Sequence, residues 1–220
     1  GVLGEWDNPY KSLDSSFEAN AIRALGRIYE AGHIEKGEKP VHWCQDCGSA
    51  LAEAEVEYQD KTSKSIDVAF KANEQSLKKL NEVFATNIVD GISFVIWTTT
   101  PWTLPSNTAL TVGANIEYLL VDTFNPYTAD PQKIVLAKSR LQAYFKPEGE
   151  AADMAYSAND KVLPYRVLAS FKGSDMVGLS YEQLLPYAQP FQDAEKAYRV
   201  IAGDFVTTED GTGIVHTAPT

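Results

Sequence analysis

The sequence predicts an α+β protein, with a β-rich, barrel-like domain containing short helices and a helical segment ahead of it. Short apolar runs of strand length recur at close spacing along most of the chain. Few stretches place apolar residues at helical spacing. Clusters rich in Gly, Pro, Asn and Asp separate the runs and mark turns. Together these observations favour short strands joined by turns.

The charge, apolar content and cysteine count of the chain limit the kinds of partner and compartment that we expect. The chain has 220 residues and a net charge of −11, with 30 acidic against 19 basic side chains. Such a surface repels a phosphate backbone, which argues against extensive nucleic-acid binding. No apolar run approaches membrane-spanning length and no signal-peptide pattern opens the chain, so we expect a soluble protein with no membrane partner. Two cysteines do not make a disulfide framework, which favours a reducing cytoplasm.

The first helix is expected at about residues 15–31. Ser15 or Ser16 can cap it, and Gly32 can end it. Its apolar face is formed by Phe17, Ala21, Ala24, Leu25 and Ile28. The start at Gly1 rather than at methionine predicts a piece excised from a longer protein.

The rest of the chain alternates as strands do, with two further helical patterns. A strand is expected at 56–58, where Val and Tyr flank Glu. Further strands are expected at 65–70, 92–96, 108–112, 118–121, 133–137, 165–171 and 197–201. Short helices are expected at 74–84 and 138–144.

The most informative string is W-T-T-T-P-W-T-L-P-S-N at residues 97–107. It follows the apolar run 92–96, and Pro101 must end that strand because it has no N–H and biases Thr100 away from helix. The threonine hydroxyls are therefore expected in a loop at the end of the strand, where Trp102 would line one side of a pocket. A bare threonine triplet is common at a β-edge, but the complete string suits a pocket that holds polar atoms and stacks a flat ring.

Two more strings accompany it, G-T-G-I-V-H-T-A-P at residues 211–219 and a Cys-containing stretch at 39–58. In this order the three strings resemble the editing domain of isoleucyl-tRNA synthetase, a class I aminoacyl-tRNA synthetase. The related valyl and leucyl enzymes carry an arginine and an acid where Thr100 and Trp102 stand here. The resemblance spans nearly the whole chain, although the stretch from about 123 to 198 contains no motif of the family.

The resemblance implies that residues 1–48 form a helical segment from the catalytic body plus a Cys-x-x-Cys turn, and residues 49–220 an editing domain. It implies hydrolysis of mischarged valyl-tRNA(Ile), and possible hydrolysis of valyl-adenylate, within a parent that ligates isoleucine to tRNA(Ile) using ATP. The expected partners are the 3′ end of the aminoacylated tRNA and the rest of the parent synthetase. A string resembling K-M-S-K-S at 61–65 lies upstream of the threonine motif, where such ATP-binding loops do not occur, so no amino-acid activation is expected.

The site residues follow from the resemblance. The expected catalytic residues are Thr98, Thr99, Thr100 and His216, and the expected substrate-binding residues are Trp102, Asn107 and Thr217. Threonine hydroxyls without an adjacent base are poor nucleophiles, so they are expected to orient the ester and a water. His216 would line the side-chain end of the pocket or orient water, with general base as the weaker option. The family also uses an aspartate beyond this motif, and the printed chain ends before it, so the fragment alone is expected to edit weakly.

Cys44 and Cys47 are spaced to share a zinc ion, but two thiolates do not close a tetrahedral site. We expect a half site without cofactor in the fragment, and zinc as possible in the full-length parent. Two other functions stay open. One is a noncatalytic module that docks on tRNA or a protein; the other is a thiol oxidoreductase, whose first cysteine should begin a helix after a buried strand.

Overall fold

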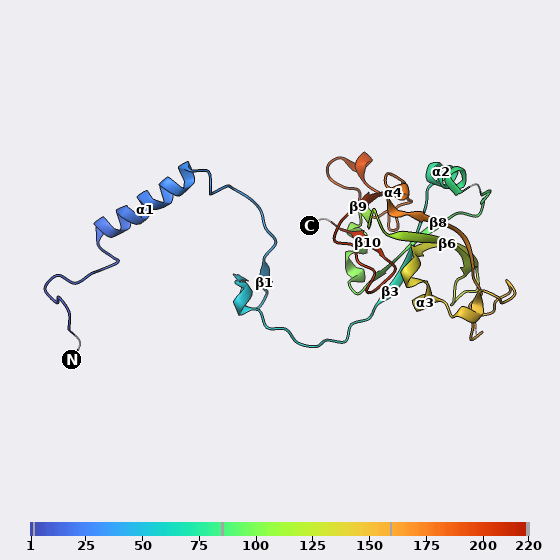
Figure 1. Cartoon of the computed structure of the whole chain (residues 1–220), viewed down its shortest axis with the longest axis horizontal. Helices are drawn as coiled ribbons and strands as arrows, with labels where there is room; N and C mark the ends of the chain where they lie inside the picture. Colours follow the sequence, from blue (N-terminus) through green and yellow to red (C-terminus); the bar gives the residue numbers. More distant parts are fainter. Residues whose placement is uncertain (2, 85, 159, 219–220) are drawn as a thin grey trace. The chain divides into compact units, whose positions relative to one another are not determined.

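The computed structural model describes residues 1, 3–84, 86–158 and 160–218. They divide into two compact units, Gly1–Lys61 and Thr62–Thr220, which can be followed along the chain in Figure 1. Within the described residues, no helix combines the length and apolar character needed to cross a membrane. The functional division at residues 48 and 49 remains a prediction.

The described residues of the first unit contain one α-helix, α1 (Ser15–Glu30), which confirms the helix expected there. Its N-cap is Asp14 rather than Ser15 or Ser16, and no side-chain hydrogen bond caps it. The chain leaves the helix through Gly32, whose φ of +78° is a conformation that glycine adopts without strain.

A hairpin follows in the same unit. Strand β1 (His42–Cys44) pairs antiparallel with β2 (Ser49–Leu51), and the 3-10 helix η1 (Glu53–Glu55) comes next. The strand expected at 56–58 is wrong, because residues 56–65 form no strand or helix. An alternating pattern becomes a strand only where a neighbour satisfies its backbone groups.

The second unit is built on a five-stranded sheet with the order β3-β4-β7-β6-β8. Its strands are β3 (Ile66–Lys71), β4 (Ser93–Thr98), β6 (Glu117–Phe124), β7 (Pro131–Ala137) and β8 (Arg166–Lys172). Neighbours pair antiparallel except β4 and β7, which are parallel. Each of these strands lies where an apolar run predicted one.

A three-stranded sheet completes this unit. Its central strand β5 (Ala109–Val112) pairs antiparallel with β10 (Ile214–Thr217) and parallel with β9 (Arg199–Ala202). Strand β10 also lies against β4, and Figure 1 shows β9 and β10 together at one side of the unit. The two sheets share one core, which brings the end of the threonine-bearing strand to the second motif.

Short helices connect the strands. The α-helices are α2 (Glu74–Phe84), α3 (Leu141–Tyr144) and α4 (Gly173–Met176), and the 3-10 helices are η2 (Pro101–Ser106), η3 (Lys138–Arg140), η4 (Pro147–Gly149) and η5 (Ala194–Lys196). Helix α2 has the predicted bounds and buries Leu80 in the core. The helix expected at 138–144 consists of η3 followed by α3.

The fold is therefore α+β with short helices, as predicted, but no closed barrel is found among the described residues. The large sheet is open, with β3 and β8 as its edges. The smaller sheet closes against its face by packing rather than by a continuous hydrogen-bond ladder.

Candidate active site

The threonine loop, defined as residues 98–107, begins at the last residue of β4 and continues into η2. Thr98 is buried, and its Oγ1 accepts the backbone N–H of Thr100 at 3.1 Å. The Oγ1 atoms of these two threonines lie 3.3 Å apart. Pro101 at the first position of η2 starts the helical turn where its missing N–H costs nothing. Thr98 thus braces the loop from inside, while Thr100 is exposed.

His216 reaches this loop from β10. Its Nε2 lies 3.0 Å from Oγ1 of Thr103, and that hydroxyl donates to the backbone oxygen of Thr100 at 2.8 Å. The contact joins the two motifs across 113 positions of sequence. Sequence reasoning missed Thr103, although its place three residues after Thr100 in the same string is a position from which a hydroxyl can bond back to the chain.

The imidazole of His216 is half-buried, and this burial lowers its pKa below the ordinary value of 6.5. Within the described part of the chain, Nδ1 of this ring is buried and contacts no hydrogen-bond partner. Burial penalises the charged form of a histidine, so the ring is neutral near pH 7.

A hollow of about 280 Å³ opens beside β4 and the second motif. Its lining comprises Trp97, Thr98, Thr99, Phe205, Thr207, Asp210 and the stretch from Gly211 to Val215. Asp210 in this lining is exposed. The hollow combines hydroxyls, one carboxylate and an indole, so it can hold a small polar ligand with a flat part.

Asn107 is engaged inside the protein. Its Oδ1 accepts the hydroxyl of Tyr181 at 2.6 Å, and its Nδ2 donates to the backbone oxygen of Ala109 at 3.0 Å. These bonds anchor the end of the threonine loop. They use one N–H and one lone pair of the amide that sequence reasoning assigned to the substrate, and that assignment stays a prediction.

The other two expected binding residues are Thr217 and Trp102. Thr217 is on β10, and its Oγ1 lies 2.8 Å from that of Thr111 on the neighbouring strand. The indole of Trp102 is 73% exposed. A side chain so open is available to stack on a ligand and contributes little to the core.

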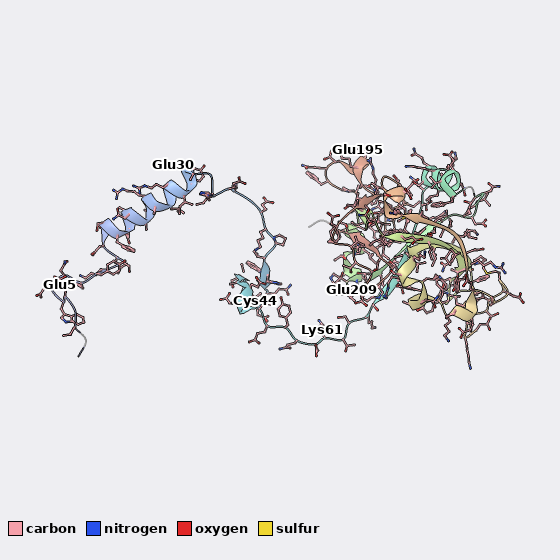
Figure 2. All side chains as sticks on the ribbon, in the orientation of Figure 1. Glu5, Glu30, Cys44, Lys61, Glu195 and Glu209 are labelled. Carbon is pink, nitrogen blue, oxygen red and sulfur yellow. The ribbon has the colours of Figure 1, made fainter. Side chains whose placement is uncertain are left out.

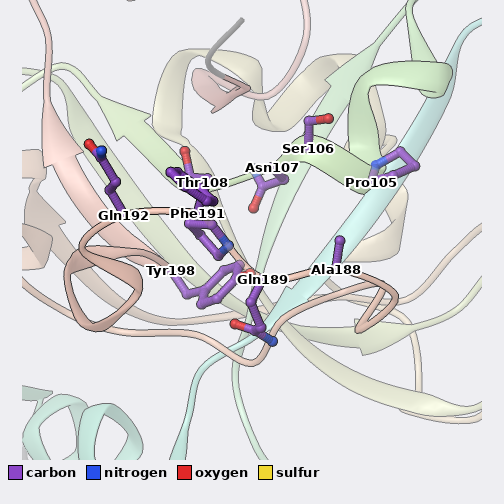
Figure 3. Close-up of a pocket in the computed structure, with 10 residues that line it drawn as sticks. Pro105, Ser106, Asn107, Thr108, Ala188, Gln189, Phe191, Gln192 and Tyr198 are labelled. Atoms are coloured by element: carbon purple, nitrogen blue, oxygen red, sulfur yellow. The ribbon is translucent and has the colours of Figure 1, made fainter.

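A second, larger hollow of about 560 Å³ borders the end of the threonine loop. Figure 3 shows Asn107 and Thr108 on the loop side, with Phe191 and Tyr198 contributing aromatic rings. Tyr198 has a left-handed backbone, with φ of +58°. No charged side chain lines this hollow among the described residues.

The cysteine pair belongs to the first unit, where Cys44 is labelled in Figure 2. The backbone N–H of Cys47 donates to Sγ of Cys44 at 3.3 Å, and this bond is the main cause that lowers the pKa of the Cys44 thiol. Gly48, with φ of +61°, closes the turn between the two strands. The turn fits two thiolates of a zinc knuckle, but no group of three or more metal-binding side chains occurs among the described residues. Cys44 ends a strand rather than beginning a helix, unlike the redox site considered above.

Comparison with known proteins identifies the family. The model of tRNA synthetases class I (I, L, M and V) matches residues 1–209. The chain is 48% identical over 219 residues to the isoleucine–tRNA ligase of Pectobacterium carotovorum subsp. carotovorum, covering 99% of this chain and 20% of that protein. It is 46% identical to the corresponding ligase of Chromobacterium violaceum, covering 100% of this chain and 20% of that one. The chain thus spans about a fifth of the length of the curated relatives that it matches.

Among solved structures, the fold is similar to the P. knowlesi cytosolic leucyl-tRNA synthetase editing domain. The TM-score is 0.46 at 14% sequence identity, and the similarity covers 73% of this chain and 61% of that one.

Proposed function

Because this chain belongs to the class I tRNA synthetases (I, L, M and V), we propose that it is an editing module that hydrolyses mischarged valyl-tRNA(Ile). Valyl-adenylate is a second substrate of the same site. The parent enzyme ligates isoleucine to tRNA(Ile) with ATP in the cytoplasm, and this module removes its errors.

The observation that carries the proposal is the hydrogen bond between Thr103 and His216, at 3.0 Å. It places the threonine loop and the G-T-G-I-V-H motif at one location, although the sequence separates them by 113 positions. A reaction site requires side chains from separate motifs to meet at one place. A threonine-rich β-edge requires no such meeting.

The need for such a module is energetic. The pocket in which the parent activates isoleucine can reject valine only through one missing methylene, which is worth about 1–3 kcal/mol of binding free energy. Isoleucyl-tRNA synthetases are themselves the standard illustration of this limit. A second site that admits valine and excludes isoleucine multiplies this discrimination. Hydrolysis makes the step irreversible.

The reaction adds water to the ester carbonyl carbon and releases valine and the hydroxyl of the terminal ribose. Threonine hydroxyls without a base are weak nucleophiles, so Thr98, Thr99 and Thr100 orient the ester and the water instead. Their hydroxyls also stabilise the oxyanion that develops on the carbonyl oxygen. Trp102 stacks on a flat group of the substrate.

The charge of the chain limits how tRNA binds. With a net charge of −11, this module gains little from counterion release on a phosphate backbone. It therefore meets only the 3′ end of the tRNA, and the rest of the parent holds the body. In a parent that binds zinc, Cys44 and Cys47 would supply two thiolate ligands, the others would come from outside this turn, and the ion would have a structural role.

The test uses the full-length parent and pre-charged valyl-tRNA(Ile). We expect rapid ester loss, with isoleucyl-tRNA(Ile) hydrolysed far more slowly. Thr99→Ala should impair deacylation, while Thr62→Ala, an exposed threonine outside regular structure, serves as the matched control. A parent that leaves valyl-tRNA(Ile) intact would favour a noncatalytic docking module instead.

A further inference from the structure

The hydroxyl of Thr103 has two hydrogen-bond partners. Its Oγ1 lies 2.8 Å from the backbone oxygen of Thr100 and 3.0 Å from Nε2 of His216. A hydroxyl carries one proton, and a carbonyl oxygen can only accept. The proton of Thr103 therefore goes to Thr100, and Oγ1 must accept from His216.

The direction of these two hydrogen bonds determines which nitrogen of the imidazole carries the proton. If Thr103 Oγ1 accepts, then Nε2 of His216 is the N–H nitrogen, and Nδ1 is the bare one. The surroundings of Nδ1 agree, since it is buried without a partner among the described residues. A buried N–H without a hydrogen-bond partner is rarer in proteins than a buried acceptor without one. An unprotonated Nδ1 therefore costs less free energy than a protonated one.

We infer that Thr103 is a positioning residue that holds His216 in its Nε2–H tautomer, and that His216 serves the threonine loop as a hydrogen-bond donor rather than as a general base. The chain of bonds runs from His216 through Thr103 to the carbonyl of Thr100. It holds the loop against β10 at the point where the catalytic threonines are presented.

The same geometry removes both nitrogens from base catalysis. A general base needs an unprotonated atom within hydrogen-bond reach of the water that it activates. Nε2 already carries a proton committed to Thr103, and Nδ1 is enclosed by the protein.

The tautomer can be observed directly, without any assay of activity. The chain contains only three histidines, His33, His42 and His216, so ¹⁵N-histidine labelling gives a simple NMR spectrum. The signals of His216 are identified by their loss in His216→Gln. We expect a pyrrole-type Nε2 and a bare, pyridine-type Nδ1 near neutral pH.

Variants of Thr103 test the positioning role. Thr103→Ser keeps the hydroxyl and should keep the wild-type spectrum, whereas Thr103→Val keeps the shape and should shift His216 toward a mixture of tautomers. A protonated Nδ1 in the wild type, or a Thr103→Val spectrum identical to wild type, would overturn the inference. Unchanged signals of His33 and His42 confirm that the variants are folded alike in the first unit.

Activity supplies a second arm, which rests on the proposed editing function. In His216→Gln the side-chain amide offers an N–H near the position of Nε2, so deacylation of valyl-tRNA(Ile) should fall by no more than about tenfold. His216→Leu has no donor and should lose on the order of 100-fold, the scale seen when one positioned donor is removed. Equal and complete loss in both variants would indicate a base. If even the wild-type parent fails to deacylate, the proposed function fails, and the NMR spectrum still decides the tautomer.

Discussion

The phenol oxygen of Tyr181 lies 2.6 Å from Oδ1 of Asn107, in a buried contact between the segment after α4 and the end of the threonine loop. Asn107 cannot swing toward a ligand without breaking this bond. The bond therefore holds the end of the loop in place, and it depends on a tyrosine 74 residues away in sequence.

Tyr181→Phe should destabilise the protein by about 1–3 kcal/mol, because the buried carbonyl of Asn107 loses its donor. The free energy of unfolding in urea, followed by near-UV circular dichroism, measures the change. Tyr187→Phe is the control, since Tyr187 is 82% exposed. Equal destabilisation by both substitutions would show that the buried bond contributes nothing special.

Thr99→Ala or Thr100→Ala in the full-length parent should slow deacylation of valyl-tRNA(Ile) and spare aminoacylation. Removal of one oriented donor raises the barrier by about 3 kcal/mol, judging from oxyanion-hole deletions. Single-turnover ester loss provides the rate, and ATP-dependent charging provides the comparison. Wild-type deacylation by both variants would disprove the assignment of the loop.

The stability of the second unit should fall on acidification, in part through His216. Burial lowers the pKa of this side chain below 6.5, so the unfolded state takes up its proton at a higher pH than the folded state does. The contribution is fully present above the unfolded pKa and is lost as the pH falls. Urea unfolding at about pH 7.5 and pH 5.5 should show a larger loss for the wild type than for His216→Gln. An equal loss would show that His216 is not coupled to folding.

Gly213→Ala should be strongly destabilising. Gly213 has φ of +79°, and a Cβ there would lie 2.5 Å from Cβ of Ala137. Strain and overpacking together should cost about 2–5 kcal/mol. Gly37→Ala is the control because its φ is ordinary and nothing lies within 4 Å of the added carbon. A thermal melt of both variants that coincides with wild type would contradict the model of a tight β7–β10 corner.

The elements that periodicity alone determines were predictable. The apolar run before the threonines forms β4, and the amphipathic stretch 74–84 forms α2. In both elements the fold buries apolar residues of the pattern. The strand expected at 56–58 failed because alternation says nothing about whether a partner strand exists. The barrel failed for a related reason, since closure depends on which strands pair.

The motifs of the candidate site could be predicted from the sequence, but the hydrogen bonds that connect them could not. The string 97–107 marks a loop rich in hydroxyls, but nothing local shows that Thr103 receives a bond from β10. The bond from Tyr181 to Asn107 is equally invisible, because that tyrosine lies in a stretch without a motif. Long-range hydrogen bonds are properties of the assembled sheets, and only the structure reveals them.

The small sheet also bears on when the site comes into being during folding. Strand β5 ends at Val112 and its partner β10 begins at Ile214, so their pairing closes a loop of roughly 100 residues and must follow the more local pairings of the large sheet. On the ribosome, the threonine loop emerges long before His216 does. Until β10 docks, Thr103 has no imidazole beside it. The newly made chain therefore presents its threonines without their support, and we expect the ability to edit to arise in the last step of folding.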